Sequence, residues 1–290
     1  MSDTSIGVIG GSGLYTMDGV TDLEEFEIDT PFGKPSDAVI VGKLDGISVA
    51  FLPRHGRKHL IPPHQINYRA NIWALKSLGV RWLMSVSAVG SLREGVEPGQ
   101  LVMVDQFIDR TRTRPSTFFE DGVAAHVSFA DPCCEVLRQA LLKSAADANL
   151  PHHDGGTYVC IEGPQFSTRA ESNLYRSWGA DVVGMTNLPE CRLAREAQMA
   201  YSTIAMATDY DCWHEGEDEV SVEAVVAVLK ANVNRAKTLL KQVIPTISAL
   251  GTSPAFSALH HAVMTADGAM DEATRKRVGL FLEDTRYHGE

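Results

Sequence analysis

The chain has 290 residues, of which 44% are hydrophobic, and a formal net charge of −11 at pH 7. This length and composition can bury one large α/β core, and the acidic balance without a basic cluster argues against nucleic acid and anionic membranes as main partners. No stretch reaches the roughly 18 apolar residues of a membrane span, and the N-terminus lacks the charged and apolar regions of a signal peptide.

Short apolar runs predict eight strands, at residues 6–9, 38–41, 47–52, 82–86, 101–104, 157–161, 182–185 and 202–207. Helical periodicity predicts helices at 67–78, 134–149, 168–179, 190–200 and 221–243. Strands that alternate with helices are typical of α/β proteins, and the first strands lie close enough along the chain for antiparallel pairing. We therefore expect a single-domain α/β fold with a mixed central sheet flanked by helices.

Local signals mark some of the helix ends. Thr168 and Glu171 form a capping box, and Pro189 is suited to a first turn. Pro245 is expected to terminate the long helix, because proline removes a backbone donor and clashes with the preceding turn.

The C-terminal part of the chain is expected to differ from the rest. A hinge is expected at 251–254, followed by short helices at 257–264 and 271–284. The expected division is a domain at 1–250 and a helical tail at 251–290 that packs on the core or on a neighbouring subunit.

The cysteines indicate the redox environment. Cys133, Cys134, Cys160, Cys191 and Cys212 show neither CxxC spacing nor a pairing pattern. Such cysteines indicate a reducing cytosol, so we expect a cytoplasmic protein without structural zinc.

Two carboxylates follow the predicted strand that ends near residue 208. In an extended chain residues i and i+2 point the same way, so Asp209 and Asp211 can face one pocket. Open α/β sheets bind ligands at the carboxyl ends of their strands. Paired carboxylates there can accept hydrogen bonds from an amino group or hold a proton for a basic ring nitrogen. An Asx-rich turn remains the plainer interpretation of the same residues.

Two other runs that follow strands carry hydrogen-bond donors. In the glycine-rich run 10–13, backbone N–H groups and the Ser12 hydroxyl can approach an anion. In the basic run 53–59, Arg54 offers a bidentate fork for phosphate and His55 can donate beside it. The glycine spacing is neither G-x-G-x-x-G nor the Walker pattern, so neither a dinucleotide nor ATP is indicated. A tight turn and a solvated basic loop are the plainer alternatives.

Three more strand ends carry residues suited to a flat ligand. Residues 85–91 pass from a strand into small side chains, against which a ligand can lie, with Ser87 as a donor. Phe166 could stack on a flat ring, and Met185 and Thr186 supply an apolar wall and a hydroxyl. Each signal is weak by itself, because ordinary core packing explains it. Together, the five strand ends indicate an anion site, a flat apolar slot and a carboxylate clamp.

Through these runs the sequence resembles the purine nucleoside phosphorylase family, in its methylthioadenosine-cleaving branch. The matching stretches lie between about residues 6 and 245 and are GVIGGSGL, DTPFGKPSDA, RHGRKH, NYRANIWALK, SAVGSLREG, VDQFIDRT, IEGPQFSTRAES, VGMTNLPE and ATDYDCWH. The DYDCW run is the most specific, because 6-oxopurine phosphorylases have an Asn-containing segment there. Ser12 stands where the family often has Thr, and residues 87–90 read Ser-Ala-Val-Gly where the family has Thr-Ala-Cys-Gly, so a hydroxyl is kept in both places. The segment after Gly251 does not match strongly.

The resemblance implies roles for individual residues. The residues that would bind phosphate are Ser12, Arg54, His55, Ser87, Ala88 and Thr186. The residues that would line the base and sugar are Ala88, Val89, Gly90, Phe166, Met185 and His59, with Val222 and Val226 around the 5′-methylthio group. Asp209 and Asp211 would carry the catalysis by meeting N7 and the exocyclic amine of adenine. His126 would reach into a neighbouring subunit's site, so the resemblance implies a homotrimer, with a hexamer as the alternative.

The implied reaction is the phosphorolysis of methylthioadenosine to adenine and methylthioribose-1-phosphate. Orthophosphate attacks C1′ through an oxocarbenium-like transition state while Asp209 protonates N7. Orthophosphate is the cosubstrate, and neither a metal nor an organic cofactor is expected. Two alternatives stay open. One is a sister enzyme for 6-oxopurine nucleosides, against which the DYD run argues. The other is a non-catalytic nucleoside-binding protein on the same fold, against which the intact phosphate set argues.

Overall fold

The structure is a computed structural model that describes residues 4–11, 14, 17–214 and 222–282, with the backbone only for 222–226. The strands are β1 (Ile6–Gly10), β2 (Val20–Phe26), β3 (Val39–Leu44), β4 (Ile47–Pro53), β5 (Trp82–Ser91), β6 (Leu101–Met103), β7 (Gln106–Arg110), β8 (His152–Asp154), β9 (Thr157–Ile161), β10 (Val182–Gly184) and β11 (Ala200–Tyr210). The helices are α1 (Tyr68–Ser77), α2 (Glu135–Asp147), α3 (Arg169–Ser177), α4 (Asn187–Glu196), α5 (Val222–Ile247) and α6 (Glu272–Leu282). Short 3-10 turns lie at Pro63–Gln65, Pro254–Ser257 and Asp267–Ala269.

All strands in the described part of the chain belong to one mixed sheet, as the sequence predicts. The main order is β2-β3-β4-β1-β5-β10-β9-β7, and β11 pairs with both β5 and β6. The first strands pair antiparallel, β2 with β3 and β3 with β4, whereas β1 runs parallel to β4 and β5. This early antiparallel pairing confirms the expectation from their closeness along the chain.

The strand β5 changes partners along one of its edges. On one edge it pairs with β11 along its whole length. On the other edge β1 pairs as far as Ser85, and β10 begins to pair only at Gly90. Residues 86–89 therefore have no strand partner on that edge among the described strands. The sheet is open at this point, and a cavity described below lies there.

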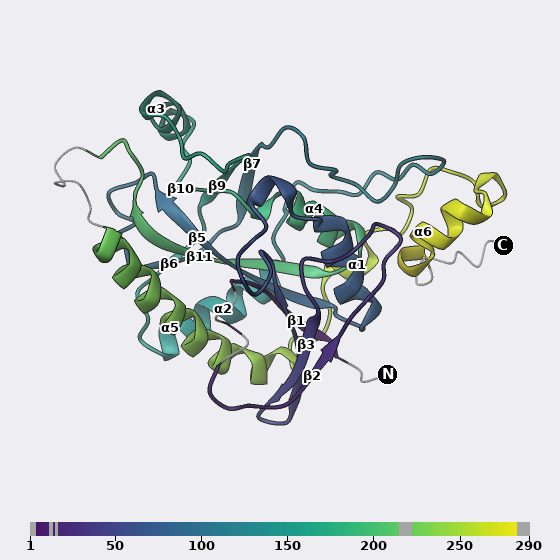
Figure 1. Ribbon diagram of the computed structural model, residues 1–290, viewed down its shortest axis with the longest axis horizontal. Helices are drawn as coiled ribbons and strands as arrows, with labels where there is room; N and C mark the ends of the chain where they lie inside the picture. Colours follow the sequence, from purple (N-terminus) through teal and green to yellow (C-terminus); the bar gives the residue numbers. More distant parts are fainter. Residues whose placement is uncertain (1–3, 12–13, 15–16, 215–221, 283–290) are drawn as a thin grey trace.

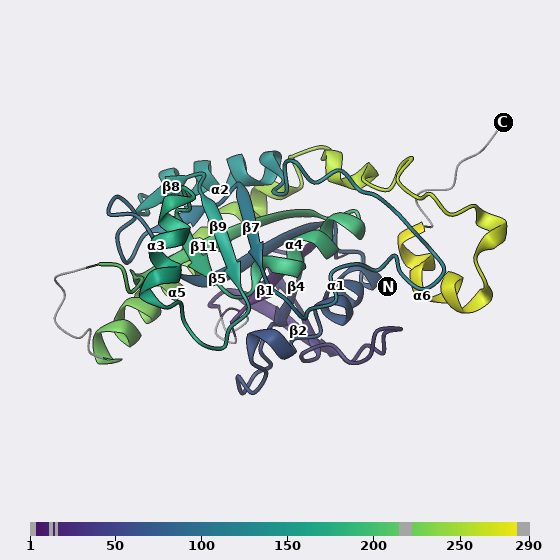
Figure 2. The ribbon, with the colours of Figure 1, turned by 90° about the horizontal axis from the view of Figure 1, so that it is seen from above.

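Helices cover both sides of the sheet (Figure 1). One core contains Ile72 and Leu75 of α1 and Leu193 of α4, and the other contains Leu141 of α2 and Leu240 of α5. Figures 1 and 2 place α6 at the opposite end of the molecule from α3. Within the described residues, no helix is both long and apolar enough to cross a membrane.

Polar edge strands account for the elements that the sequence analysis missed. The missed strands are β2, β7 and β8. β2 reads VTDLEEF and is mostly exposed, while β8 is the short segment His152–Asp154. Charged residues on edge strands protect against edge-to-edge association. They also interrupt the apolar run from which a strand is predicted in a sequence.

Two predictions for the C-terminal third are wrong. Pro245 does not end α5, which continues to Ile247. The last turns persist because Val243, Ile244 and Ile247 are buried in the core, which outweighs the loss of one backbone hydrogen bond. The helix expected at 257–264 is replaced by turns, with His261 at a positive φ of 63°. The last predicted helix is present as α6, whose Phe281 packs on Phe118 with ring centroids 4.3 Å apart.

The packing beneath the open part of the sheet can be tested at Gly184, the last residue of β10. A Cβ there would lie 2.0 Å from the Tyr158 hydroxyl oxygen, and Tyr158 is fully buried. Gly184→Ala is expected to lower the free energy of unfolding by about 1–3 kcal/mol, because overpacking forces side chains or backbone to shift. Gly279→Ala in α6, where a Cβ meets nothing within 4 Å, is expected to raise it by about 0.5–1 kcal/mol. Urea unfolding measures the free energy of unfolding of both variants. Equal changes in the two would contradict the close contact between Gly184 and Tyr158.

Candidate functional site

A cavity of about 550 Å³ lies where β5 lacks a partner, at the carboxyl ends of several strands. This volume is in the range of small-molecule sites. Twelve residues that the sequence analysis singled out line it: Arg54, His55, His59, Ser87, Ala88, Val89, Gly90, Phe166, Met185, Thr186, Asp209 and Asp211. The chain brings them together because β4 and β10 end at this gap from opposite directions, and β5 and β11 run along it.

The other predicted site residues are placed differently. Ser12 lies outside the described residues, as do the side chains of Val222 and Val226. Leu229 and Val233, further along α5, line the cavity, so this helix does form one wall. Their spacing from Val226, by three and seven residues, was the available sequence signal. His126 is exposed and does not line the cavity, and its backbone N–H donates to Ala262 O at 2.9 Å.

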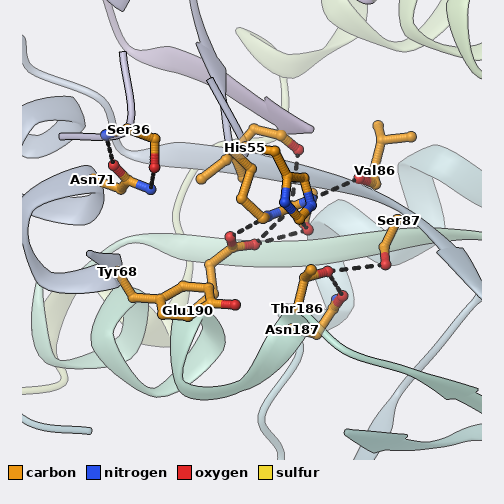
Figure 3. Close-up of polar contacts among 12 residues, drawn as sticks. Ser36, His55, Tyr68, Asn71, Val86, Ser87, Thr186, Asn187 and Glu190 are labelled. Carbon is orange, nitrogen blue, oxygen red and sulfur yellow. Dashed lines mark hydrogen bonds and ion pairs between the residues drawn. The ribbon is translucent and has the colours of Figure 1, made fainter. Parts of the chain in front are cut away.

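One end of the cavity is rich in hydroxyl groups (Figure 3). The Ser87 and Thr186 hydroxyl oxygens lie 3.1 Å apart. The buried Tyr158 hydroxyl lies 3.3 Å from Ser87 Oγ and accepts from Thr186 N–H at 3.5 Å. Burial raises the pKa of Tyr158, so this phenol remains a hydrogen-bond donor at neutral pH. The cluster therefore presents neutral donors, the kind of group that binds an anion without a net charge of its own.

Arg54 forms the floor of the same end and is paired with Glu190. Its side chain is 2% exposed, and its Nε and Nη2 donate to the two Glu190 oxygens at 2.6 and 2.9 Å. Burial by itself would lower the pKa of Arg54, but the Glu190 carboxylate more than offsets this and raises it. Further bonds run from Arg54 Nη1 to Val86 O at 3.0 Å and from Nη2 to Ser85 Oγ at 2.7 Å.

Glu190 is a residue that the sequence analysis did not assign to the site. It is fully buried, and its carboxylate also accepts from Ser85 Oγ and Tyr201 Oη, both at 2.9 Å. The helix α4 that carries it was predicted, but nothing local shows that its acidic residue faces an arginine 136 positions earlier. The helix also carries Arg192, Arg195 and Glu196, so its sequence does not single out Glu190.

His55 is held as a neutral imidazole. Its Nδ1 lies 2.8 Å from Ile61 O, and because a carbonyl only accepts, Nδ1 must carry the hydrogen. The ring stacks on His59 with centroids 4.4 Å apart. Burial lowers the pKa of His55 to about 4. In this tautomer Nε2 is an acceptor, so the donor role expected of His55 requires an added proton.

The carboxylate pair lies around Gly90 on β5. A register shift between Ala207 and Asp209 turns the end of β11. A Cβ on Gly90 would lie 3.3 Å from Asp209 Oδ1 and 3.4 Å from Asp211 Cβ. The Thr208 hydroxyl donates to Asp209 Oδ2 at 2.6 Å. Asp211 lines the cavity, and its Oδ2 is buried without a hydrogen-bond partner in the described part of the chain.

Arg114 fixes the backbone around the remaining walls and was also missed. It is buried and donates to the carbonyl oxygens of Met185 and Leu188 at 2.7 Å and of Glu162 at 2.6 Å. These bonds join the segments that follow β9 and β10, and the wall residue Met185 is the first residue after β10. Phe166, in the loop after β9, lies at the cavity but is 84% exposed, so in this chain its ring is not packed.

Known proteins share both the sequence and the fold. The model of the phosphorylase superfamily matches residues 5–245. S-methyl-5′-thioadenosine phosphorylase of Geobacter sulfurreducens is 53% identical over 96% of this chain and 97% of its own length. The protein of that name from Thermosynechococcus vestitus is 54% identical over 96% and 97%.

Solved structures give the same result. A methylthioadenosine phosphorylase from an antarctic soil metagenomic library superposes with a TM-score of 0.94 at 48% identity, over 97% of this chain and all of the other. A mutant adenosine/methylthioadenosine phosphorylase from Schistosoma mansoni, solved with methylthioadenosine, has a TM-score of 0.80 at 33% identity, over 98% of this chain and 99% of the other. Since the family model covers most of the chain and these relatives nearly all of it, the chain belongs to the phosphorylase superfamily.

Proposed function

We propose that this protein cleaves S-methyl-5′-thioadenosine with orthophosphate, giving adenine and 5-methylthioribose-1-phosphate. The observation that carries the proposal is a single cavity with anion-binding groups at one end and an unpartnered carboxylate oxygen of Asp211 in its wall. The exocyclic amine of adenine is a donor of the kind that this oxygen lacks. Relatives about 50% identical to this chain carry the name of this activity.

In the proposed reaction, phosphate lies at the end of the cavity formed by Arg54, His55, Ser87 and Thr186, with Ser12 and Ala88 completing its contacts. The sugar and base lie between Met185, Phe166 and the small residues 88–90, so that phosphate and C1′ are held in line. Val222 and Val226 of α5 surround the methylthio group.

Asp209 is the proposed acid for purine N7. The Thr208 hydroxyl occupies its Oδ2, so the proton is held on Oδ1, the oxygen beside Gly90. Protonation of N7 neutralises the negative charge that develops on the leaving base, and such an acid contributes about 10²–10⁴-fold. Because phosphate is itself the nucleophile, the proposed chemistry needs neither a metal nor an organic cofactor.

We propose that the chain acts as a homotrimer in the cytoplasm, with a domain at 1–250 and a tail at 251–290. Phe166, which lines the cavity and is apolar yet 84% exposed, supports a neighbouring subunit there, and His126 is exposed away from this chain's own cavity, where it could reach a neighbour's. The described cysteines are free, four of them buried and Cys212 exposed, which fits a reducing compartment.

Adenine release is expected to require phosphate. Ser87→Ala is expected to raise the KM for phosphate about tenfold or more, since a hydrogen bond to a charged group contributes roughly 1.5–3 kcal/mol. Ser91→Ala is the matched control on the same strand, because Ser91 is buried and does not line the cavity. Its KM for phosphate should match the wild type. Equal adenine release with and without phosphate would identify a hydrolase instead.

Base selection is expected to depend on Asp211. A carboxylate facing the O6 of a 6-oxopurine leaves two acceptors unsatisfied, at a cost of about 1–3 kcal/mol. The wild type should thus prefer methylthioadenosine over methylthioinosine by about ten- to a few hundred-fold in kcat/KM. Asp211→Asn supplies an amide donor and should narrow or reverse this ratio, whereas Asp209→Asn should depress turnover of both substrates. An unchanged ratio in Asp211→Asn would show that another group reads the 6-position.

The oligomer is expected to be part of the active enzyme. Sedimentation velocity at assay concentrations should give a trimer, and His126→Ala should lower kcat/KM for methylthioadenosine without dissociating it. A fully active monomer would contradict this assembly.

A further inference from the structure

The phosphate end of the cavity carries little net positive charge. Among the described lining residues, Arg54 is the one arginine or lysine. Its charge is matched by Glu190, which is fully buried at 2.6 Å. Glu190 accepts from Arg54 twice, from Ser85 and from Tyr201, so its carboxylate accepts four hydrogen bonds. The pair therefore adds one positive and one negative charge to the site.

A phosphate dianion placed here would be poorly compensated. Ser87 and Thr186 offer neutral hydroxyls, and most of the Arg54 hydrogens are engaged by Glu190, Ser85 and backbone carbonyls. Taking two negative charges out of water is costly unless they are paired or neutralised by a proton. The site thus favours phosphate with a smaller net charge.

His55 is placed to accept the proton that reduces this charge. Ile61 O fixes the hydrogen on Nδ1. Nε2 then has a lone pair and no hydrogen-bond partner among the described residues, and the ring lines the cavity. Nε2 therefore accepts a hydrogen from phosphate, either from the single hydroxyl of the dianion or from an added proton that lowers the charge of the bound anion.

We propose that orthophosphate binds together with one proton, shared between His55 Nε2 and a phosphate oxygen. The inference rests on the proposed function, because it takes this end of the cavity as the phosphate site. The dianion in solution has one hydroxyl hydrogen, so binding adds a second proton from solvent to compensate its charge, and the bound pair carries a net charge of −1. The monoanion in solution already has both hydrogens, and none is taken up. In both cases the added hydrogen bond is the same.

The other charged groups around His55 are already engaged. Arg54 precedes it and is paired with Glu190. Next to the loop, Asp37 accepts from the backbone N–H and the Nε of Arg57 at 2.7 and 3.0 Å, and Glu25 pairs with the same guanidinium. His59, stacked on His55, is the neighbouring group that could take the proton instead.

Proton uptake can be counted by calorimetry. Inorganic phosphate is titrated into the whole protein in buffers of different ionisation enthalpy, at about pH 8 and about pH 6, on either side of the second ionisation of phosphate. We expect about one proton taken up per phosphate at the higher pH and close to none at the lower. Sulfate, which is a dianion at both, should take up about one proton at both. Binding of phosphate at the higher pH without uptake overturns the inference.

Three variants assign the proton. His55→Gln can donate an amide hydrogen without a proton from solvent, so it should bind phosphate with uptake abolished. His64→Gln, on the adjacent 3-10 turn and not lining the cavity, should retain the wild-type uptake. Loss of uptake in His59→Gln but not in His55→Gln overturns the assignment to His55.

The wild-type measurement also separates this inference from the proposed function. Phosphate-dependent adenine release without proton uptake contradicts the inference and leaves phosphorolysis intact. Phosphate-independent adenine release, with no phosphate binding, overturns both.

Discussion

The buried pair of Arg54 and Glu190 is the interaction on which the rest of the site depends. Arg54 follows β4 and reaches Ile9 O of β1 and Val86 O of β5, while Glu190 on α4 accepts from Tyr201 of β11. The pair thus joins four strands to a helix at the point where the sheet is open. Burying both charges is costly, and loss of one partner typically destabilises a fold by about 3–5 kcal/mol. In this chain the pair also shapes the floor of the cavity, which apolar side chains in the same places would not do.

Other buried polar residues hold the walls of the cavity in place through hydrogen bonds. Arg114 joins the carbonyl oxygens at the ends of β9 and β10, and Tyr158 supports Ser87 and Thr186 from beneath. Residues that would touch a ligand are therefore held by buried polar residues that would not. Preorganised groups of this kind favour binding because they need no reordering when the ligand arrives.

The sequence was informative where the signal is local. Apolar runs that end in small, hydroxyl or acidic residues located the ends of β5, β10 and β11, which carry eight of the twelve predicted residues that line the cavity. It was uninformative where function depends on a distant partner. Glu190 and Arg114 act through contacts with other elements, and the hydrogen on His55 is set by the Ile61 carbonyl. Pro245 shows the same limit for secondary structure, because tertiary burial of Val243 and Ile244 overrides the local preference.

The partner change along β5 has a consequence for the order of assembly during synthesis. The cavity needs β1 and β4 from the first part of the chain and β11 from the last third, since Trp82 pairs with both Ile6 and Ala200. Contacts so distant in sequence form slowly, because loop closure must precede them. A nascent chain that has not yet released residues 200–211 from the ribosome lacks one edge of the cavity. Ligand binding can therefore stabilise the fold only after these residues have emerged, and a shorter nascent chain has no help from substrate against premature misfolding.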